Sequence, residues 1–131
     1  IGNAKEYIQE HIKVAEDLNK PIVISEFGFP RAKESLSPEA SVKNRNDFYE
    51  ALFLELKQSF ENKGVLAGVN FWGFGGFAKT NPITGKWEKG DDFSADPPQE
   101  PQGLNTVFSS DKSTLQIIKK YNKIVNPEAV E

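Results

Sequence analysis

The sequence predicts an α/β fold built on a parallel sheet. Two short apolar runs, residues 21–26 and 65–72, have the composition of buried strands, and a stretch with helical periodicity separates them. Further helical stretches stand at both ends of the chain. Strand, helix and strand in this order form a βαβ unit, whose strands are parallel and whose crossover is right-handed. We therefore expect one α/β domain over residues 1–131.

Residues 1–19 are expected to form an amphipathic helix. Their apolar side chains recur at spacings of three and four residues, which places them along one helix face that packs on the core. This helix is expected to end before Pro21, because proline cannot continue a helix and disfavours the helical conformation of the preceding residue. The expected apolar face consists of Ile1, Ala4, Tyr7, Ile8, Ile12, Ala15 and Leu18.

Glu26 ends the first expected strand. The residues before it, Ile22-Val23-Ile24-Ser25, are β-branched or small, as in a parallel strand covered on both faces. Carboxylates are seldom buried in such places without a partner. The strand alone leaves two interpretations, a structural salt bridge and a functional carboxylate, and it slightly favours the salt bridge. Arg31, just past the strand, is either an arginine in solvent or a group that reaches an acid or a sugar hydroxyl.

A second helix is expected to end before residue 64. Ser37-Pro38-Glu39 resembles a helix start, with serine as the N-cap and proline at the first helical position. Gly64 suits the position just after a helix, where the backbone commonly adopts the left-handed conformation. The expected apolar face of this helix consists of Phe48, Tyr49, Leu52, Phe53, Leu56 and Phe60.

The second strand runs from Val65 to Trp72. Its two-residue period places Gly68, Asn70 and Trp72 on one face. Because the two strands are parallel, Trp72 is expected beside Glu26 at the carboxyl end of the sheet, where α/β folds build their sites.

A long loop follows, from residue 73 to about residue 109. Its first glycines do not belong to a phosphate-binding P-loop, because no Lys-Ser or Lys-Thr completes the motif. Residues 81–87 are expected to form a turn or a small hairpin. Asp91, Asp92 and Asp96 are too irregularly spaced for a calcium loop and are expected in solvent. Trp87 and the other aromatic residues interleaved in this segment favour an ordered loop.

The last helix is expected to begin with a capping box from Ser113 to Gln116 and to end near Asn126. Its apolar face consists of Leu115, Ile117, Ile118, Tyr121, Ile124 and Val125.

Composition excludes several classes of function. A net charge of −3 with dispersed Lys and Arg gives neither a nucleic-acid-binding face nor a polybasic membrane patch. No apolar run approaches the ~20 residues needed to cross a bilayer. Without cysteine, and with one histidine, the chain has no thiolate chemistry and no multi-histidine zinc site, and nothing in it requires a cofactor. Because the chain begins at Ile1 and lacks methionine, we expect a part of a longer protein.

Three motifs resemble glycoside hydrolases of family five. The closer match, with the endo-β-1,4-mannanase branch, rests on residues 26–31, 70–76 and 96–104. Residues 24–28 (Ile-Ser-Glu-Phe-Gly) and 69–73 (Val-Asn-Phe-Trp-Gly) are similar to the seventh and eighth strands of that family's (β/α)₈ barrel. The third motif, Asp-Pro-Pro-Gln-Glu-Pro-Gln-Gly-Leu at residues 96–104, lies in the long loop. The resemblance covers nearly the whole chain and implies the C-terminal portion of a TIM barrel.

The resemblance implies retaining, endo-acting hydrolysis of β-mannan or mannooligosaccharides. By that resemblance Glu26 matches the catalytic nucleophile and Trp72 the aromatic platform beneath the sugar at the cleaved bond. Asn70, Arg31 and Trp87 are the further candidate substrate-binding residues. A secreted, periplasmic or cell-surface location is also implied.

The acid/base glutamate of the family lies in an Asn-Glu pair on the fourth strand, and this chain contains no Asn-Glu pair. We therefore expect the chain alone to be inactive and to need the missing N-terminal part of the barrel. Two alternatives remain, another family-five β-glycanase of the cellulase type and a non-catalytic carbohydrate-binding piece. Open edges on a two-stranded sheet also predict either self-association or added strand pairing from residues 77–109.

Overall fold

A parallel pair of strands with helices on both sides forms the framework of the protein. The structure is a computed structural model that describes residues 1–127. Its elements are α1 (Gly2–Asp17), β1 (Ile22–Phe27), the short 3₁₀ helix η1 (Ala32–Glu34), α2 (Lys43–Glu61), β2 (Leu66–Phe71), β3 (Phe74–Gly76), β4 (Val107–Phe108) and α3 (Lys112–Val125).

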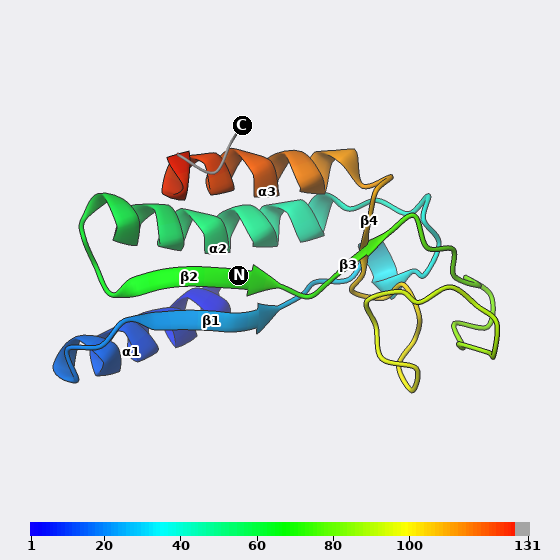
Figure 1. The fold of residues 1–131 in the computed structure, drawn as a ribbon, viewed down its shortest axis with the longest axis horizontal. Helices are drawn as coiled ribbons and strands as arrows, with labels where there is room; N and C mark the ends of the chain where they lie inside the picture. Colours follow the sequence, from blue (N-terminus) through cyan, green and yellow to red (C-terminus); the bar gives the residue numbers. More distant parts are fainter. Residues whose placement is uncertain (128–131) are drawn as a thin grey trace.

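The unit β1-α2-β2 is the predicted βαβ unit. The two strands pair in parallel, with Ile22 opposite Leu66 and Phe27 opposite Phe71. Figure 1 shows α1 on one side of this pair and α2 and α3 on the other. The expectation of an α/β fold with a parallel sheet is therefore confirmed for the described residues.

Aromatic residues form the centre of the core. The ring of Phe27, at the end of β1, packs edge-on against Tyr49 and Phe53 of α2, with centroid distances of 4.9 and 5.8 Å. Phe53 in turn stacks on Tyr121 of α3 at 5.6 Å. Edge-to-face and offset pairs at such distances are favourable for aromatic rings. These contacts hold the carboxyl end of β1 against both helices.

The first helix covers less of the core than its pattern predicted. Ile8 and Ala15 are buried, but Ile1, Tyr7 and Leu18 are each more than half exposed. The sheet of residues 1–127 has only two strands, so it offers α1 a narrow surface. Only the centre of the predicted apolar face therefore finds partners.

The ends of two helices also differ from the sequence predictions. Residues 37–40 form a turn, in which Ser37 accepts N–H groups from Glu39 and Ala40, and α2 begins only at Lys43. At its other end, Lys63 rather than Gly64 has the left-handed conformation, with φ of 54°. Gly64 instead packs closely on α2, where a Cβ atom would lie 2.8 Å from the hydroxyl of Ser59.

The start of α3 also differs from the prediction, because its N-cap is Asp111, two residues before the predicted Ser113. The predicted capping box does not form, because the hydroxyl of Ser113 accepts a hydrogen bond from Asn46 of α2 instead. The neighbouring Thr114 hydroxyl donates to the same asparagine. This contact ties α2 to α3.

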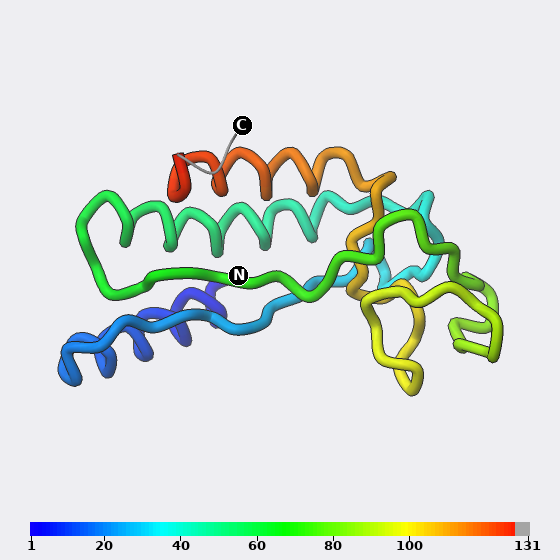
Figure 2. The backbone as a smooth tube through the Cα atoms, viewed as in Figure 1, coloured from blue at the N-terminus to red at the C-terminus, as the bar shows by residue number. Residues whose placement is uncertain are grey.

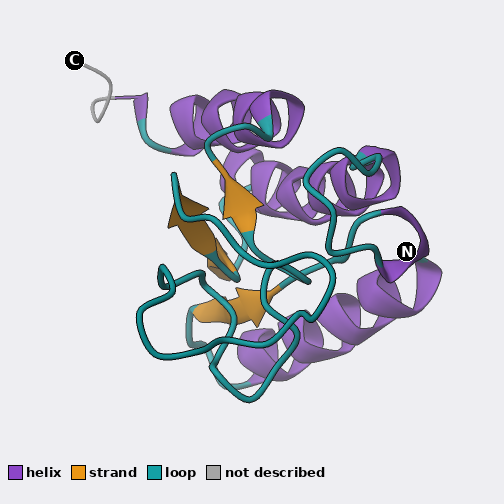
Figure 3. Cartoon of the chain, turned by 90° about the vertical axis from the view of Figure 1, so that its right-hand side faces the viewer, coloured by secondary structure: helices purple, strands orange, loops and turns teal. Residues whose placement is uncertain are grey.

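The loop from residue 73 to residue 106 is ordered, as predicted, and lies at the carboxyl ends of β1 and β2. Figure 2 follows it from green to yellow, and Figure 3 looks onto it from that end. β3 and β4 form a second parallel pair, so the strand pairing predicted from residues 77–109 to cover the edges of the first sheet is not what residues 1–127 show. This second pair does not extend the first sheet, and within residues 1–127 β1 and β2 pair only with each other. None of the described helices is long and apolar enough to span a membrane.

Tyr49 provides a test of the core. Its side chain is fully buried, and its hydroxyl has no hydrogen-bond partner in the described residues. Burial raises its pKa above the ordinary value of 10.0. Because an unpaired buried hydroxyl is destabilising, we expect Tyr49→Phe to raise the free energy of unfolding by about 1 kcal/mol at neutral pH.

Tyr49 also predicts how the stability of the fold depends on pH. Above about pH 10 the unfolded chain loses the Tyr49 proton while the folded protein keeps it, so stability falls as pH rises further. Tyr49→Phe removes this contribution. Urea unfolding at neutral and alkaline pH measures both effects, and a phenylalanine variant that is less stable than wild type at every pH would contradict this account.

Candidate functional site

Glu26 and Trp72 meet at the carboxyl ends of the two parallel strands. Glu26 is the penultimate residue of β1, and Trp72 directly follows β2. The backbone N–H of Trp72 donates to the carbonyl of Phe27 at 2.6 Å, which continues the strand pairing past β2. Glu26 and Trp72 both line a cavity of about 360 Å³. Its walls are Glu26, Gly28, Trp72, Pro97, Glu100 and Asn105.

Gly28 permits this close arrangement. A Cβ atom at this position would lie 3.0 Å from the carbonyl oxygen of Trp72 and 3.3 Å from the Cβ of Asn105. A side chain at position 28 would therefore force apart the two chain segments that carry Trp72 and Asn105. The absence of a side chain brings the long loop against the end of β1.

Glu26 is exposed at the cavity and takes part in no ion pair within the described residues. The nearest candidate partner along the chain, Arg31, pairs with Asp111 instead. The interpretation of Glu26 as half of a structural salt bridge therefore finds no support in residues 1–127. An exposed carboxylate beside a tryptophan in a cavity is an arrangement that suits a ligand.

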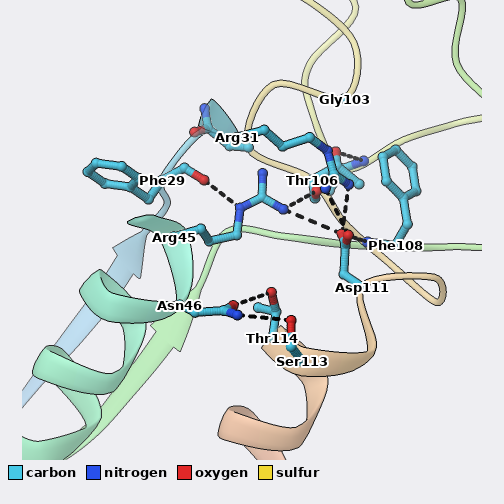
Figure 4. A network of polar contacts seen from close by, with 12 residues as sticks. Phe29, Arg31, Arg45, Asn46, Gly103, Thr106, Phe108, Asp111, Ser113 and Thr114 are labelled. Carbon is cyan, nitrogen blue, oxygen red and sulfur yellow. Dashed lines mark hydrogen bonds and ion pairs between the residues drawn. The ribbon is translucent and has the colours of Figure 1, made fainter. Parts of the chain in front are cut away.

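Arg31 does not line the cavity, and its side chain reaches an acid, which is one of the contacts considered for it from the sequence. Its side chain is fully buried and forms two parallel hydrogen bonds of 2.8 Å with the carboxylate of Asp111. Bidentate pairs of this kind are the strongest geometry for arginine and carboxylate. The side chain joins the segment after β1 to the start of α3 (Figure 4).

A second buried arginine, Arg45 of α2, shares Asp111. It lies 3.4 Å from the carboxylate and donates to the carbonyls of Phe29, Leu104 and Thr106 at 2.6, 3.1 and 3.0 Å. Burial, and next the positive charge of Arg31, lower the pKa of Arg45. Figure 4 shows the network at the junction of α2, α3 and the long loop. This network of Arg31, Arg45 and Asp111 holds the long loop in place, but none of the three residues lines the cavity.

Two other candidates also lie away from Glu26. Trp87 is half-buried and stacks on Phe93, with ring centroids 5.4 Å apart and planes 18° apart. Asn70 is exposed on β2 and lines a larger, mostly apolar groove of about 810 Å³ between β2, α2 and α3. That groove contains no carboxylate, so we place the candidate site at the smaller cavity. The structure thus unites Glu26 and Trp72 but leaves Asn70, Arg31 and Trp87 outside.

Comparison with known proteins assigns the family. The family model described as GH family 5 beta-mannosidase-like matches residues 1–129 of the chain. The chain belongs to this glycoside hydrolase family. The resemblance of the three sequence motifs to family five is thereby confirmed.

Solved structures agree with the family 5 assignment. A glycoside hydrolase family 5 mannosidase from Rhizomucor miehei is similar with 31% identity and a TM-score of 0.78, over 92% of this chain and 30% of that chain. A variant of a family 5 mannosidase from the same organism, in complex with mannosyl-fructose, is similar with 32% identity and a TM-score of 0.76, over 93% and 31%. The chain thus spans about 30% of the length of these enzymes. A comparison with curated proteins gave no match.

The loop contributes cavity residues of this family 5 chain that the sequence did not single out. Pro97, Glu100 and Asn105 line the cavity with Glu26. The family-five motif at residues 96–104 was the available signal for Pro97 and Glu100, and Asn105 directly follows it. Residues 1–127 contain no cluster of three His, Cys, Asp or Glu side chains that would hold a metal ion.

The prediction that Asp96 lies in solvent is wrong, because its side chain is buried. Its carboxylate accepts hydrogen bonds from the N–H of Gly103, the N–H of Asn105 and the hydroxyl of Thr106, at 2.8, 3.2 and 2.6 Å. Asp91 and Asp92 are exposed as expected. Asp96 therefore anchors the loop from inside.

Proposed function

We propose that this chain is part of a retaining, endo-acting β-1,4-mannanase and that Glu26 is its catalytic nucleophile. The observation that carries the proposal is the shared cavity of Glu26 and Trp72 at the carboxyl ends of β1 and β2. Family membership supports glycoside hydrolysis, and the complex of a related mannosidase with mannosyl-fructose supports a mannose-containing substrate. The two strands would be the seventh and eighth of a (β/α)₈ barrel.

In this mechanism the carboxylate of Glu26 attacks the anomeric carbon of the sugar. The glycosidic bond breaks, an acid protonates the leaving oxygen, and a covalent glycosyl-enzyme forms. Water, deprotonated by the same acid/base group, then releases the sugar with its original configuration. The exposure of Glu26 to the cavity supports this role, because a nucleophile must be ionised and within reach of substrate.

Trp72 would form the floor of the sugar site. The flat face of an indole ring suits the apolar face of a sugar, and its N–H can bind a polar partner. Glu100 and Asn105, in the same cavity, offer an acceptor and an amide to sugar hydroxyls. We propose that the acid/base glutamate lies outside this chain, a view supported by the chain spanning about 30% of the related enzymes.

The test uses the protein extended upstream to the length of the related enzymes. We expect it to hydrolyse β-1,4-mannan within the chain, to release β-configured products first, and to leave cellulose largely intact. Reducing-end assays and proton NMR of the first products measure this. The isolated chain is expected to release no sugar from either polymer. Preferential cleavage of cellulose, or first products of α configuration, would contradict the proposal.

A further inference from the structure

The loop at residues 94–106 is closed by two buried polar side chains. One is Asp96, whose carboxylate binds the far end of the loop, as described above. The other is Gln102, whose side chain is buried to 3% exposure and points back into the loop. The two side chains thus connect the loop from opposite ends.

The amide of Gln102 is fully occupied. Its Nε2 group donates to the carbonyl oxygens of Asp96, Pro97 and Glu100, at 3.2, 2.7 and 3.1 Å. Its Oε1 accepts the hydroxyl of Ser94 at 2.8 Å. Only a neutral amide of this length supplies both a donating and an accepting end at one position. A carboxylate there would place an acceptor against carbonyl acceptors.

These contacts reach the candidate site directly. Pro97 and Glu100, two of the residues whose carbonyls Gln102 holds, line the cavity of Glu26. The side chain of Glu100 is exposed, so no buried contact of its own fixes it, and its position depends on its backbone. The backbone at Pro97 and Glu100 is held by the Gln102 amide, which itself does not line the cavity.

We propose that Gln102 is a positioning residue, which acts through the backbone of Pro97 and Glu100 to set the loop wall of the sugar site beside Glu26. The inference rests on the proposed function, because the effect is measured through hydrolysis. Its substrate class is that of the same site, a β-mannan chain. Loss of the amide donors is expected to impair sugar binding more than the chemical step.

Two substitutions in the extended protein separate the loss of the Gln102 amide donors from the effect of a negative charge at the same position. Gln102→Met removes both ends of the amide at every pH. Gln102→Glu keeps the shape, but its ionised carboxyl faces carbonyl oxygens, and its protonated form regains one donor. Each variant is expected to raise KM for mannooligosaccharide about fivefold at neutral pH, with kcat within about twofold of wild type.

The pH profile gives a readout that a merely structural role would not produce. Carbonyl oxygens around the introduced carboxyl disfavour its ionised form and raise its pKa. The ratio of kcat/KM between Gln102→Glu and wild type is therefore expected to rise as pH falls from about 8 to 5, while the ratio for Gln102→Met stays flat. The charged groups nearby are Asp96 and Glu100 in the loop and Arg45 of α2, which binds the carbonyl of Leu104.

Gln99→Glu is the matched control, because Gln99 is exposed in the same loop and does not line the cavity. It adds the same charge without removing the amide of Gln102, and wild-type KM is expected. Hydrogen exchange of residues 96–105 provides a readout that needs no activity, with faster exchange expected in both Gln102 variants. If neither variant folds, Ser94→Ala, which removes the partner of Oε1, is expected to raise KM and exchange in the same direction.

The outcomes separate the two proposals. Wild-type extended protein without mannan hydrolysis overturns the proposed function, and loop exchange then decides the positioning role alone. Active wild type with unchanged KM, unchanged exchange and a flat pH ratio in folded Gln102 variants overturns the positioning role and leaves the function standing. Equal effects of Gln99→Glu and Gln102→Glu would also overturn it, because charge alone would explain them.

Discussion

Glu26→Gln is expected to lower kcat for mannan in the extended protein by roughly 10³-fold or more, because the neutral amide cannot form the covalent glycosyl-enzyme. The side chain keeps its size, and Glu26 has no ion pair in residues 1–127, so folding is expected to be unaffected. Steady-state hydrolysis and thermal unfolding measure the two effects.

The matched control is Glu6→Gln, on the exposed face of α1 and away from the cavity. It is expected to retain wild-type kcat and KM. Glu100→Gln serves as a second comparison, since Glu100 shares the cavity and is proposed to bind hydroxyls rather than to attack. It is expected to weaken binding and to retain measurable turnover. Near-wild-type turnover in Glu26→Gln would remove the nucleophile assignment.

Asp111→Asn is expected to cost about 3 kcal/mol of unfolding free energy, because it leaves two buried arginines without their shared negative charge. Both arginine side chains are fully buried, and Asp111 also accepts the N–H of Phe108 at 2.9 Å. Removing Arg31 in the same protein, as Arg31→Met, relieves the repulsion from Arg45 and is expected to recover part of the loss. Urea unfolding of the single and double variants measures the coupling.

The surface pair of Lys43 and Asp47 provides the control for this ion-pair test. Both side chains are largely exposed and lie one turn apart on α2. Asp47→Ala is expected to change the unfolding free energy by less than about 0.5 kcal/mol. Equal costs for Asp47→Ala and Asp111→Asn would show that burial does not strengthen the Asp111 network.

Local patterns were sufficient to predict the framework. Apolar periodicity located the two helices around residues 48–60 and 115–125, and the continuous runs ending at Glu26 and Trp72 located the paired strands. Parallel pairing then placed these two residues at one end of the sheet, because the order strand, helix, strand allows little else. The nearness of Glu26 and Trp72 was therefore predictable from the sequence.

Long-range contacts account for most of what the sequence did not predict. Arg31 and Asp111 are 80 positions apart, and nothing local to either residue indicates the other. Asp96 resembled a solvent-exposed acid because the donors that it binds come from residues 103–106, after an irregular loop. Ser37-Pro38 has the composition of a helix start, but a turn uses the same serine contacts.

The most direct test of the account is to trap the covalent intermediate. A 2-deoxy-2-fluoro-β-mannooligosaccharyl fluoride reacts with a retaining nucleophile through its good leaving group, and the fluorine slows release of the resulting glycosyl-enzyme. After digestion of the extended protein, mass spectrometry is predicted to find the sugar on the peptide that contains Glu26, attached to that carboxylate. A sugar attached to Glu100 or to any other residue would contradict the account.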